Sequence, residues 1–238
     1  MSALSGRTAL VTGASRGIGA GIATALASNG ARVALLARSE SKLSELSRKL
    51  KGSFAVSCDI TQMVDVERAV ERVSREFSGG PDILVNNAGI FGVAPVEETS
   101  TEFFVDTINT NLVAPFLFLR SFTAEMKKRG KGHIVTVGSI ADRTIYSGNA
   151  AYSAAKFGMR AVHEVLRAET RGSGVRATLI SPAATNTSIW DTVTVTDPVE
   201  RPHSKRPMLE AEDVVSAVLF ALTQPERVNI DELRLSHS

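Results

Sequence analysis

The sequence predicts a doubly wound α/β fold, in which helices cover both faces of a parallel β-sheet. Three observations predict it: short apolar runs alternate with longer amphipathic segments, a glycine cluster closes the first run, and no internal repeat or linker divides the 238 residues. Strands buried on both faces are nearly continuous apolar runs, and parallel strands need helical crossovers. We therefore expect a single domain of three layers.

Seven β-branched or aliphatic runs are the expected strands: 8–12, 31–37, 53–58, 82–87, 133–138, 175–181 and 228–235. Segments with helical period separate most of them. In the stretch 103–126, one face of the expected helix carries Phe104, Ile108, Leu112, Leu119, Phe122 and Met126. The stretch 182–210 has four of the eight prolines and no clear period, so we expect a mobile substrate lid there.

Composition excludes several classes of protein. The formal net charge is +2 and acidic and basic residues are interleaved, so no basic stripe indicates nucleic-acid binding. No apolar run approaches the length of a membrane span and no secretion signal is evident, which favours a cytoplasmic protein. The single cysteine, Cys58, excludes an internal disulfide and is expected to be buried. The histidines lack metal-ligand spacing and are expected to be packing or surface residues: His133, His163, His203 and His237.

A glycine cluster follows the first expected strand. The sequence TGASRGIG, residues 12–19, places Gly13, Gly17 and Gly19 at the turn into a helix. Without side chains, backbone N–H groups can approach a pyrophosphate at a helix N-terminus, where the helix dipole favours anions. A tight strand-to-helix turn is the other explanation.

A tyrosine and a lysine stand one helical turn apart. Tyr152 precedes Lys156 by four residues, so both side chains lie on one face of a helix. A half-buried ring beside a solvated amine is one explanation. In the other, the ammonium lowers the pKa of the phenol toward working pH and makes it a proton donor or acceptor. The second tyrosine, Tyr146, has Ala150 at this spacing, so we expect it to line the substrate pocket or to pack near it.

Five motifs in order resemble the short-chain dehydrogenase/reductase family: TGASRGIG, NNAG at 86–89, Ser139 thirteen residues before Tyr152, YSAAK at 152–156, and SPAATNT at 181–187. The similarity covers essentially the whole chain. It implies a Rossmann-like domain with seven parallel strands and a nicotinamide cofactor. It also implies a Ser/Tyr/Lys catalytic group assisted by an asparagine, which here would be Asn111.

The chemistry of a ketone reduction gives each of these residues a role. Negative charge develops on the substrate oxygen and must be stabilised and protonated. We expect Tyr152 to donate the proton and Ser139 to hydrogen-bond the oxygen. The resemblance implies that Lys156 also holds the nicotinamide ribose, and that Asn111 supports a water-linked proton path to it; a polar residue tolerated within the helix is the alternative for Asn111. Trp190, in the expected lid, is a candidate for contact with substrate or for interior packing.

The end of the second strand favours NADP(H). An acid there would bind the ribose 2′-hydroxyl of NAD, whereas arginine attracts a 2′-phosphate. Ala37 occupies the place where NAD-preferring family members usually carry the acid, and Arg38 follows it. Arg16, in the glycine turn, can approach the same phosphate. Two solvated surface arginines are the alternative.

Further cofactor contacts follow from the resemblance. Pro182 is followed by Ala183, where the family commonly has a glycine. Alanine lacks the freedom of glycine at positive φ, and this position lies near the expected contact with the nicotinamide amide. The full set of expected cofactor residues is Gly13, Ser15, Arg16, Gly17, Ile18, Gly19, Arg38, Asp59, Ile60, Asn87, Gly89, Tyr152, Lys156, Pro182, Thr185 and Thr187.

Three functions stay open. The first is a reductase of small ketones or 3-hydroxy acids, to whose members the terminal QPERVNIDELRL is similar. The second is a 3-oxoacyl-[acyl-carrier-protein] reductase, because the basic residues of 126–132 and Arg171 could meet an acidic carrier. The third, a non-catalytic nucleotide-binding regulator, is disfavoured by the intact catalytic group. The helices expected at 98–129 and 150–171 resemble those that pair in family tetramers, so we expect a homodimer or homotetramer.

Overall fold

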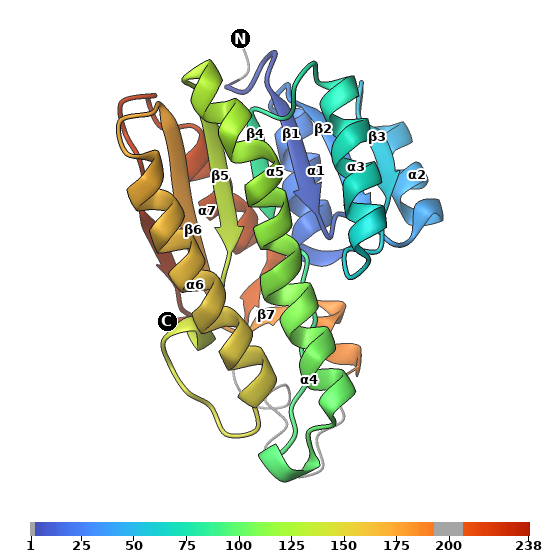
Figure 1. Ribbon diagram of the computed structural model, residues 1–238, viewed down its shortest axis with the longest axis vertical. Coiled ribbons are helices and arrows are strands. Elements are labelled where there is room, and N and C mark those ends of the chain that lie inside the picture. The colour runs from blue at the N-terminus through green and yellow to red at the C-terminus, as the bar shows by residue number, and fades with distance from the viewer. Residues whose placement is uncertain (1–2, 193–206) are drawn as a thin grey trace.

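Seven parallel strands form the central sheet of the computed structural model, which describes residues 3–192 and 207–238 (Figure 1). The strand order is β3-β2-β1-β4-β5-β6-β9, and each neighbouring pair is parallel. The strands are β1 (Thr8–Thr12), β2 (Arg32–Ala37), β3 (Phe54–Ser57), β4 (Ile83–Asn86), β5 (Gly132–Val137), β6 (Val175–Pro182) and β9 (Glu232–Leu235). The predicted Rossmann-like fold is confirmed.

Helices cover both faces of this sheet: α1 (Gly17–Ser28), α2 (Glu40–Lys49), α3 (Met63–Glu76), α4 (Thr101–Ile108), α5 (Ala114–Arg129), α6 (Ala150–Thr170) and α7 (Ala211–Leu222). Successive strand side chains point to opposite faces. In β1, Ala9 and Val11 pack with α1, α2 and α7, whereas Leu10 packs with α3, α5 and α6. Two apolar cores result, and this is why the strands are apolar throughout.

One part of the helix prediction is wrong. The helices α4 and α5 are continuous through a π-helical turn, Asn109–Val113, which the pattern did not predict. A π turn inserts an extra residue and rotates the side chains that follow it around the axis. Leu112, Leu119, Phe122 and Met126 nevertheless pack in or against one core, whereas Phe104 is 37% exposed.

The stretch predicted as a lid is described only at its two ends. Two short strands there, β7 (Thr185–Asn186) and β8 (Leu209–Glu210), form a separate parallel pair that the sequence did not predict. A 3₁₀ turn, Ser188–Thr192, follows β7. Residues 193–206, which include His203, lie outside the described residues.

Two histidines and the cysteine are core residues. His133 pairs with Thr178 (Nε2 to Oγ1, 2.9 Å) and His163 pairs with Thr136 (Nδ1 to Oγ1, 3.0 Å). Burial lowers the pKa of His133 to about 3 and that of His163 to about 4, so both rings are neutral at pH 7. Cys58 is buried, as expected. No helix within the described ranges is long and apolar enough to cross a membrane.

Candidate active site

A cavity of about 1400 Å³ lies at the carboxyl ends of the strands. From β1 the chain adds strands toward β3, and from β4 it adds strands toward β9. The loops that follow β1 and β4 therefore run in opposite directions and leave a cleft between them. All sixteen residues expected to bind the cofactor line this cavity, together with Ser139, Tyr146 and Trp190. Asn111 is the one expected site residue that does not line it.

The glycine turn leaves room for a ligand against the first helix. Gly13 has a φ of +70°, and a Cβ on Gly19 would lie 2.2 Å from the Gly13 carbonyl oxygen, so side chains are excluded at both positions. Arg16 precedes α1 without a capping hydrogen bond from its side chain, and the first turn has no acidic residue. These features fit a pyrophosphate bound at the helix N-terminus.

The NNAG turn is fastened to β1 by a residue that the sequence analysis missed. The hydroxyl oxygen of Thr12 accepts hydrogen bonds from the backbone N–H groups of Asn87 (3.0 Å) and Ala88 (3.1 Å). The Asn87 side chain donates in return to the Thr12 carbonyl (2.9 Å). The glycine turn after β1 and the NNAG turn after β4 are thus held as one unit, which forms a wall of the cavity.

Three cationic side chains line the end of the cavity beyond β2. Arg16 and Arg38 were expected there, and Lys42, in the first turn of α2, joins them. Lys42 stands four residues after Arg38, and that spacing was the available signal. This donor set fits a 2′-phosphate better than a 2′-hydroxyl, because a phosphate carries the complementary charge.

The loop after β6 does not need glycine. In the described part of the chain Ser78 is the non-glycine residue with a positive φ, so Ala183 adopts an ordinary backbone conformation. Its N–H donates to the Leu235 carbonyl (2.9 Å), which fixes the loop to the last strand. The alanine is therefore accommodated without strain.

Ser139, Tyr152 and Lys156 meet at one point of the cavity. Ser139 follows β5 and lines the cavity with Tyr152 of α6, and its side chain acts to lower the pKa of the Tyr152 phenol. Lys156, one turn further along α6, is 6% exposed and donates to the Val137 carbonyl (3.1 Å). Its Nζ lies 5.5 Å from the centre of the Tyr152 ring. The expected constellation is present.

The expected lowering of the Tyr152 pKa is not found. Burial raises the pKa of Tyr152 to about 12, the nearby Ser139 side chain opposes this, and the charge of Asp142 adds to it. Burial also lowers the pKa of Lys156 to about 8, with Asp142 acting in the opposite direction. Removal from water penalises both charged forms, and the lysine ammonium is directed to a carbonyl rather than to the phenol.

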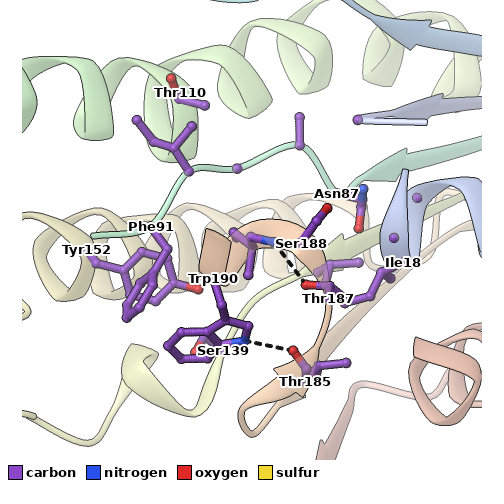
Figure 2. Close-up of a pocket in the computed structure, with 18 of the residues that line it drawn as sticks. Ile18, Asn87, Phe91, Thr110, Ser139, Tyr152, Thr185, Thr187, Ser188 and Trp190 are labelled. Carbon is purple, nitrogen blue, oxygen red and sulfur yellow. Dashed lines mark hydrogen bonds between the residues drawn. The ribbon is translucent and has the colours of Figure 1, made fainter. Parts of the chain in front are cut away.

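An aromatic wall stands beside Tyr152 (Figure 2). The Phe91 ring meets the rings of Tyr152 and Trp190 edge-on, with centroids 4.8 Å apart in each pair. The indole N–H of Trp190 donates to the Thr185 carbonyl (2.9 Å). Trp190 therefore borders the site as expected. Phe91 has no sequence signal beyond its place two residues after the NNAG turn.

Comparison with known proteins gives the family. Residues 7–197 match the family described as short chain dehydrogenase. This chain belongs to the short-chain dehydrogenase family. It is 39% identical over 236 residues to glycine betaine reductase ATRR of Emericella nidulans; the match covers 97% of this chain but only 18% of that protein.

Two solved structures match along the whole fold. A metagenomic short-chain oxidoreductase in complex with NADP has a TM-score of 0.82 and 33% identity, covering 100% of both chains. The closed form of serine dehydrogenase complexed with NADP+ has a TM-score of 0.88 and 30% identity, covering 96% of this chain and 94% of that one.

Asn111 holds the aromatic wall of this short-chain dehydrogenase in place. It lies in the π turn, is 2% exposed, and accepts from the Ile90 N–H (2.9 Å) while donating to the Ile90 carbonyl (2.8 Å). Ile90 precedes Phe91, so the π turn positions the loop whose ring packs on Tyr152. This clasp gives Asn111 a specific structural partner.

We expect Asn111→Ala to lower the free energy of unfolding by roughly 1 to 3 kcal/mol, because it leaves both backbone groups of Ile90 without their partner. Urea denaturation of the purified variants measures this. The matched control is Asn109→Ala in the same π turn, which should change stability by less than about 0.5 kcal/mol. Equal losses in the two variants would show that the clasp contributes nothing specific.

Proposed function

We propose that the protein is an NADP(H)-dependent oxidoreductase that transfers hydride between the nicotinamide and a small ketone or its secondary alcohol, including 3-hydroxy acids. The observation that carries this proposal is the meeting of Ser139, Tyr152 and Lys156 in a cleft that fits a dinucleotide. Family membership supports the oxidoreductase class.

The residues of the site suit the direction of reduction. The bound nicotinamide would supply the hydride. With a pKa of about 12, the Tyr152 phenol is protonated at neutral pH and can donate its proton to the developing alkoxide. The Ser139 hydroxyl lines the cavity near Tyr152 and can orient the same oxygen. Lys156, with a pKa of about 8, is mostly charged at pH 7 and stabilises the tyrosinate that remains.

The choice of NADP(H) rests on Arg16, Arg38 and Lys42 at one end of the cavity. Two similar solved proteins were crystallised with NADP or NADP+, which supports the choice. The substrate end has aromatic and small polar side chains, among them Phe91, Ser147 and Asn149. Similar proteins carry names with substrates as different as glycine betaine and serine, so we propose only a small polar carbonyl compound.

The carrier-protein alternative is disfavoured by position. Its basic residues, 126–132 and Arg171, lie where α5 leads into β5 and where α6 leads toward β6. These are the amino ends of the parallel strands, whereas the cleft lies at their carboxyl ends, on the opposite side of the sheet (Figure 1). A carrier bound there would hold its acyl group away from Tyr152.

Assembly into a homodimer or homotetramer is part of the proposal. The helices α4 and α5, which are continuous through the π turn, lie with α6 on the same face of the sheet (Figure 1). These helices and the π turn carry large apolar side chains that are 38–57% exposed: Val105, Val113, Phe116, Phe157 and Val165. A second copy would cover these side chains.

Cofactor preference is tested by a charge reversal. We expect NADPH to be preferred over NADH, and Arg38→Asp to weaken NADPH binding roughly ten- to a hundredfold, because the new carboxylate repels the 2′-phosphate. Dissociation constants for both cofactors measure this. Arg48→Asp, in the last turn of α2, makes the same charge change and should have little effect on the dissociation constant of NADPH. Equal affinity of the wild-type protein for NADPH and NADH would contradict the assignment.

The two tyrosines give a matched pair for catalysis. Tyr152→Phe removes the proton donor while keeping the shape, so kcat should fall by a factor on the order of 10² to 10⁴ with little change in NADPH binding. Tyr146→Phe should keep kcat within roughly tenfold and alter mainly KM. Reduction of a panel of carbonyl compounds, followed as NADPH consumption, measures both. Near-normal turnover by Tyr152→Phe with an inactive Tyr146→Phe would reverse the roles.

The assembly is tested by light scattering at micromolar concentration. We expect a mass of two or four times the 25.3 kDa of the chain. Phe116→Glu would place a charge among the exposed apolar side chains and should shift the mass toward the monomer. A monomeric wild-type protein would refute the proposed assembly.

A further inference from the structure

A buried carboxylate lies three residues after Ser139. Asp142 is 1% exposed, although a carboxylate is costly to bury without partners. Ser181, on β6, donates a hydrogen bond to its Oδ2 (2.6 Å), and Arg143 donates one to its Oδ1 (2.7 Å). The guanidinium of Arg160, on α6, lies 3.7 Å from Oδ1.

The two arginines connect Asp142 to the last strand. Arg160 makes two hydrogen bonds with Glu232 on β9 (3.3 and 3.2 Å), and Arg143 contacts the same carboxylate. Arg160 also lies 3.9 Å from Glu164, one turn further along α6. The two arginines and their carboxylate partners thus join the loop after β5 to α6 and β9, and the arginines compensate the buried charge of Asp142.

The cluster adjoins the candidate catalytic group through α6. Tyr152, Lys156 and Arg160 are spaced by four residues, so they form one stripe on that helix. Asp142 also fixes the loop of Ser139, because its N–H donates to the Ser139 carbonyl (3.0 Å). The pKa values of Tyr152 and Lys156 both respond to the Asp142 charge, which raises each of them.

We propose that Asp142 is a positioning residue for the reaction: it anchors the Ser139 loop to β6 and α6, and its negative charge stabilises the buried Lys156 ammonium. This inference rests on the proposed function for its role in turnover. Asp142 acts through Ser139 and Lys156, and Arg143 and Arg160, which also pair with Glu232, compensate part of its charge.

The direct test is an NMR titration of the Lys156 side chain, assigned by the loss of its signal in Lys156→Met. Asp142→Asn keeps the size of the side chain and removes its charge, so the midpoint should move down from that of the wild type by roughly one pH unit. Arg160→Gln removes a cation and leaves Asp142 less compensated, so the midpoint should move up. Asp231→Asn, at the exposed outer end of the neighbouring ion pair with Arg167, should leave it unchanged.

Opposite shifts in Asp142→Asn and Arg160→Gln support the inference. An unchanged midpoint in either folded variant overturns it. If Asp142→Asn does not fold, Arg160→Gln alone decides by the direction of its shift, and a midpoint that stays or moves down is contrary to the proposal.

Kinetics separate this inference from the proposed function. With 2,3-butanedione as probe, or the panel compound reduced fastest, kcat/KM of Asp142→Asn relative to wild type should decline as the pH rises from 6 to 9, because Lys156 loses its proton earlier. A purely structural role would lower kcat/KM by the same factor at each pH. If the wild-type protein reduces no compound of the panel with NADPH, the proposed function fails, whereas the NMR midpoints still decide the effect of Asp142.

Discussion

The reversal of winding between β1 and β4 is the constraint on which the rest of this structure depends. The carboxyl ends of parallel strands all lie on one side of the sheet. Where the connections from two neighbouring strands run in opposite directions, their loops leave the strand ends uncovered. The glycine turn, the NNAG turn and Ser139 follow β1, β4 and β5, which are neighbours in the sheet. Thr12 then holds the glycine turn and the NNAG turn together through hydrogen bonds, so these two turns form one wall of the cleft.

Removal from water sets the chemistry of that cleft. Burial raises the pKa of Tyr152 and lowers that of Lys156, so a protonated phenol stands beside an amine that titrates near pH 8. A proton donor for reduction needs no lowered pKa, because the developing alkoxide is a far stronger base than a phenolate. The charge of Asp142 opposes the effect of burial on the lysine. The site is thus balanced between desolvation and a single compensating carboxylate.

The strands and most of the cleft could be predicted because their signals are local. Apolar runs mark strands buried on both faces, and the glycines at 13 and 19 are required by contacts of their own turn. The aromatic wall at Phe91 and the cluster at Asp142 could not be predicted, since their partners lie tens of residues away. The π turn interrupts a helix that the pattern described as regular. The direction of the Tyr152 pKa shift depends on burial, which the spacing of two residues does not report.

Binding of NADPH in this cleft, with the nicotinamide near Tyr152, can be tested through the only tryptophan of the chain, Trp190, which lines the same cavity. Trp190 is excited while NADPH is added to the protein in steps. The quenching of the indole emission and the energy transfer to the reduced nicotinamide are measured at each step. We expect saturable transfer, tighter binding of NADPH than of NADH, and displacement by NADP+. Unchanged Trp190 emission with no transfer at saturating NADPH would contradict this expectation.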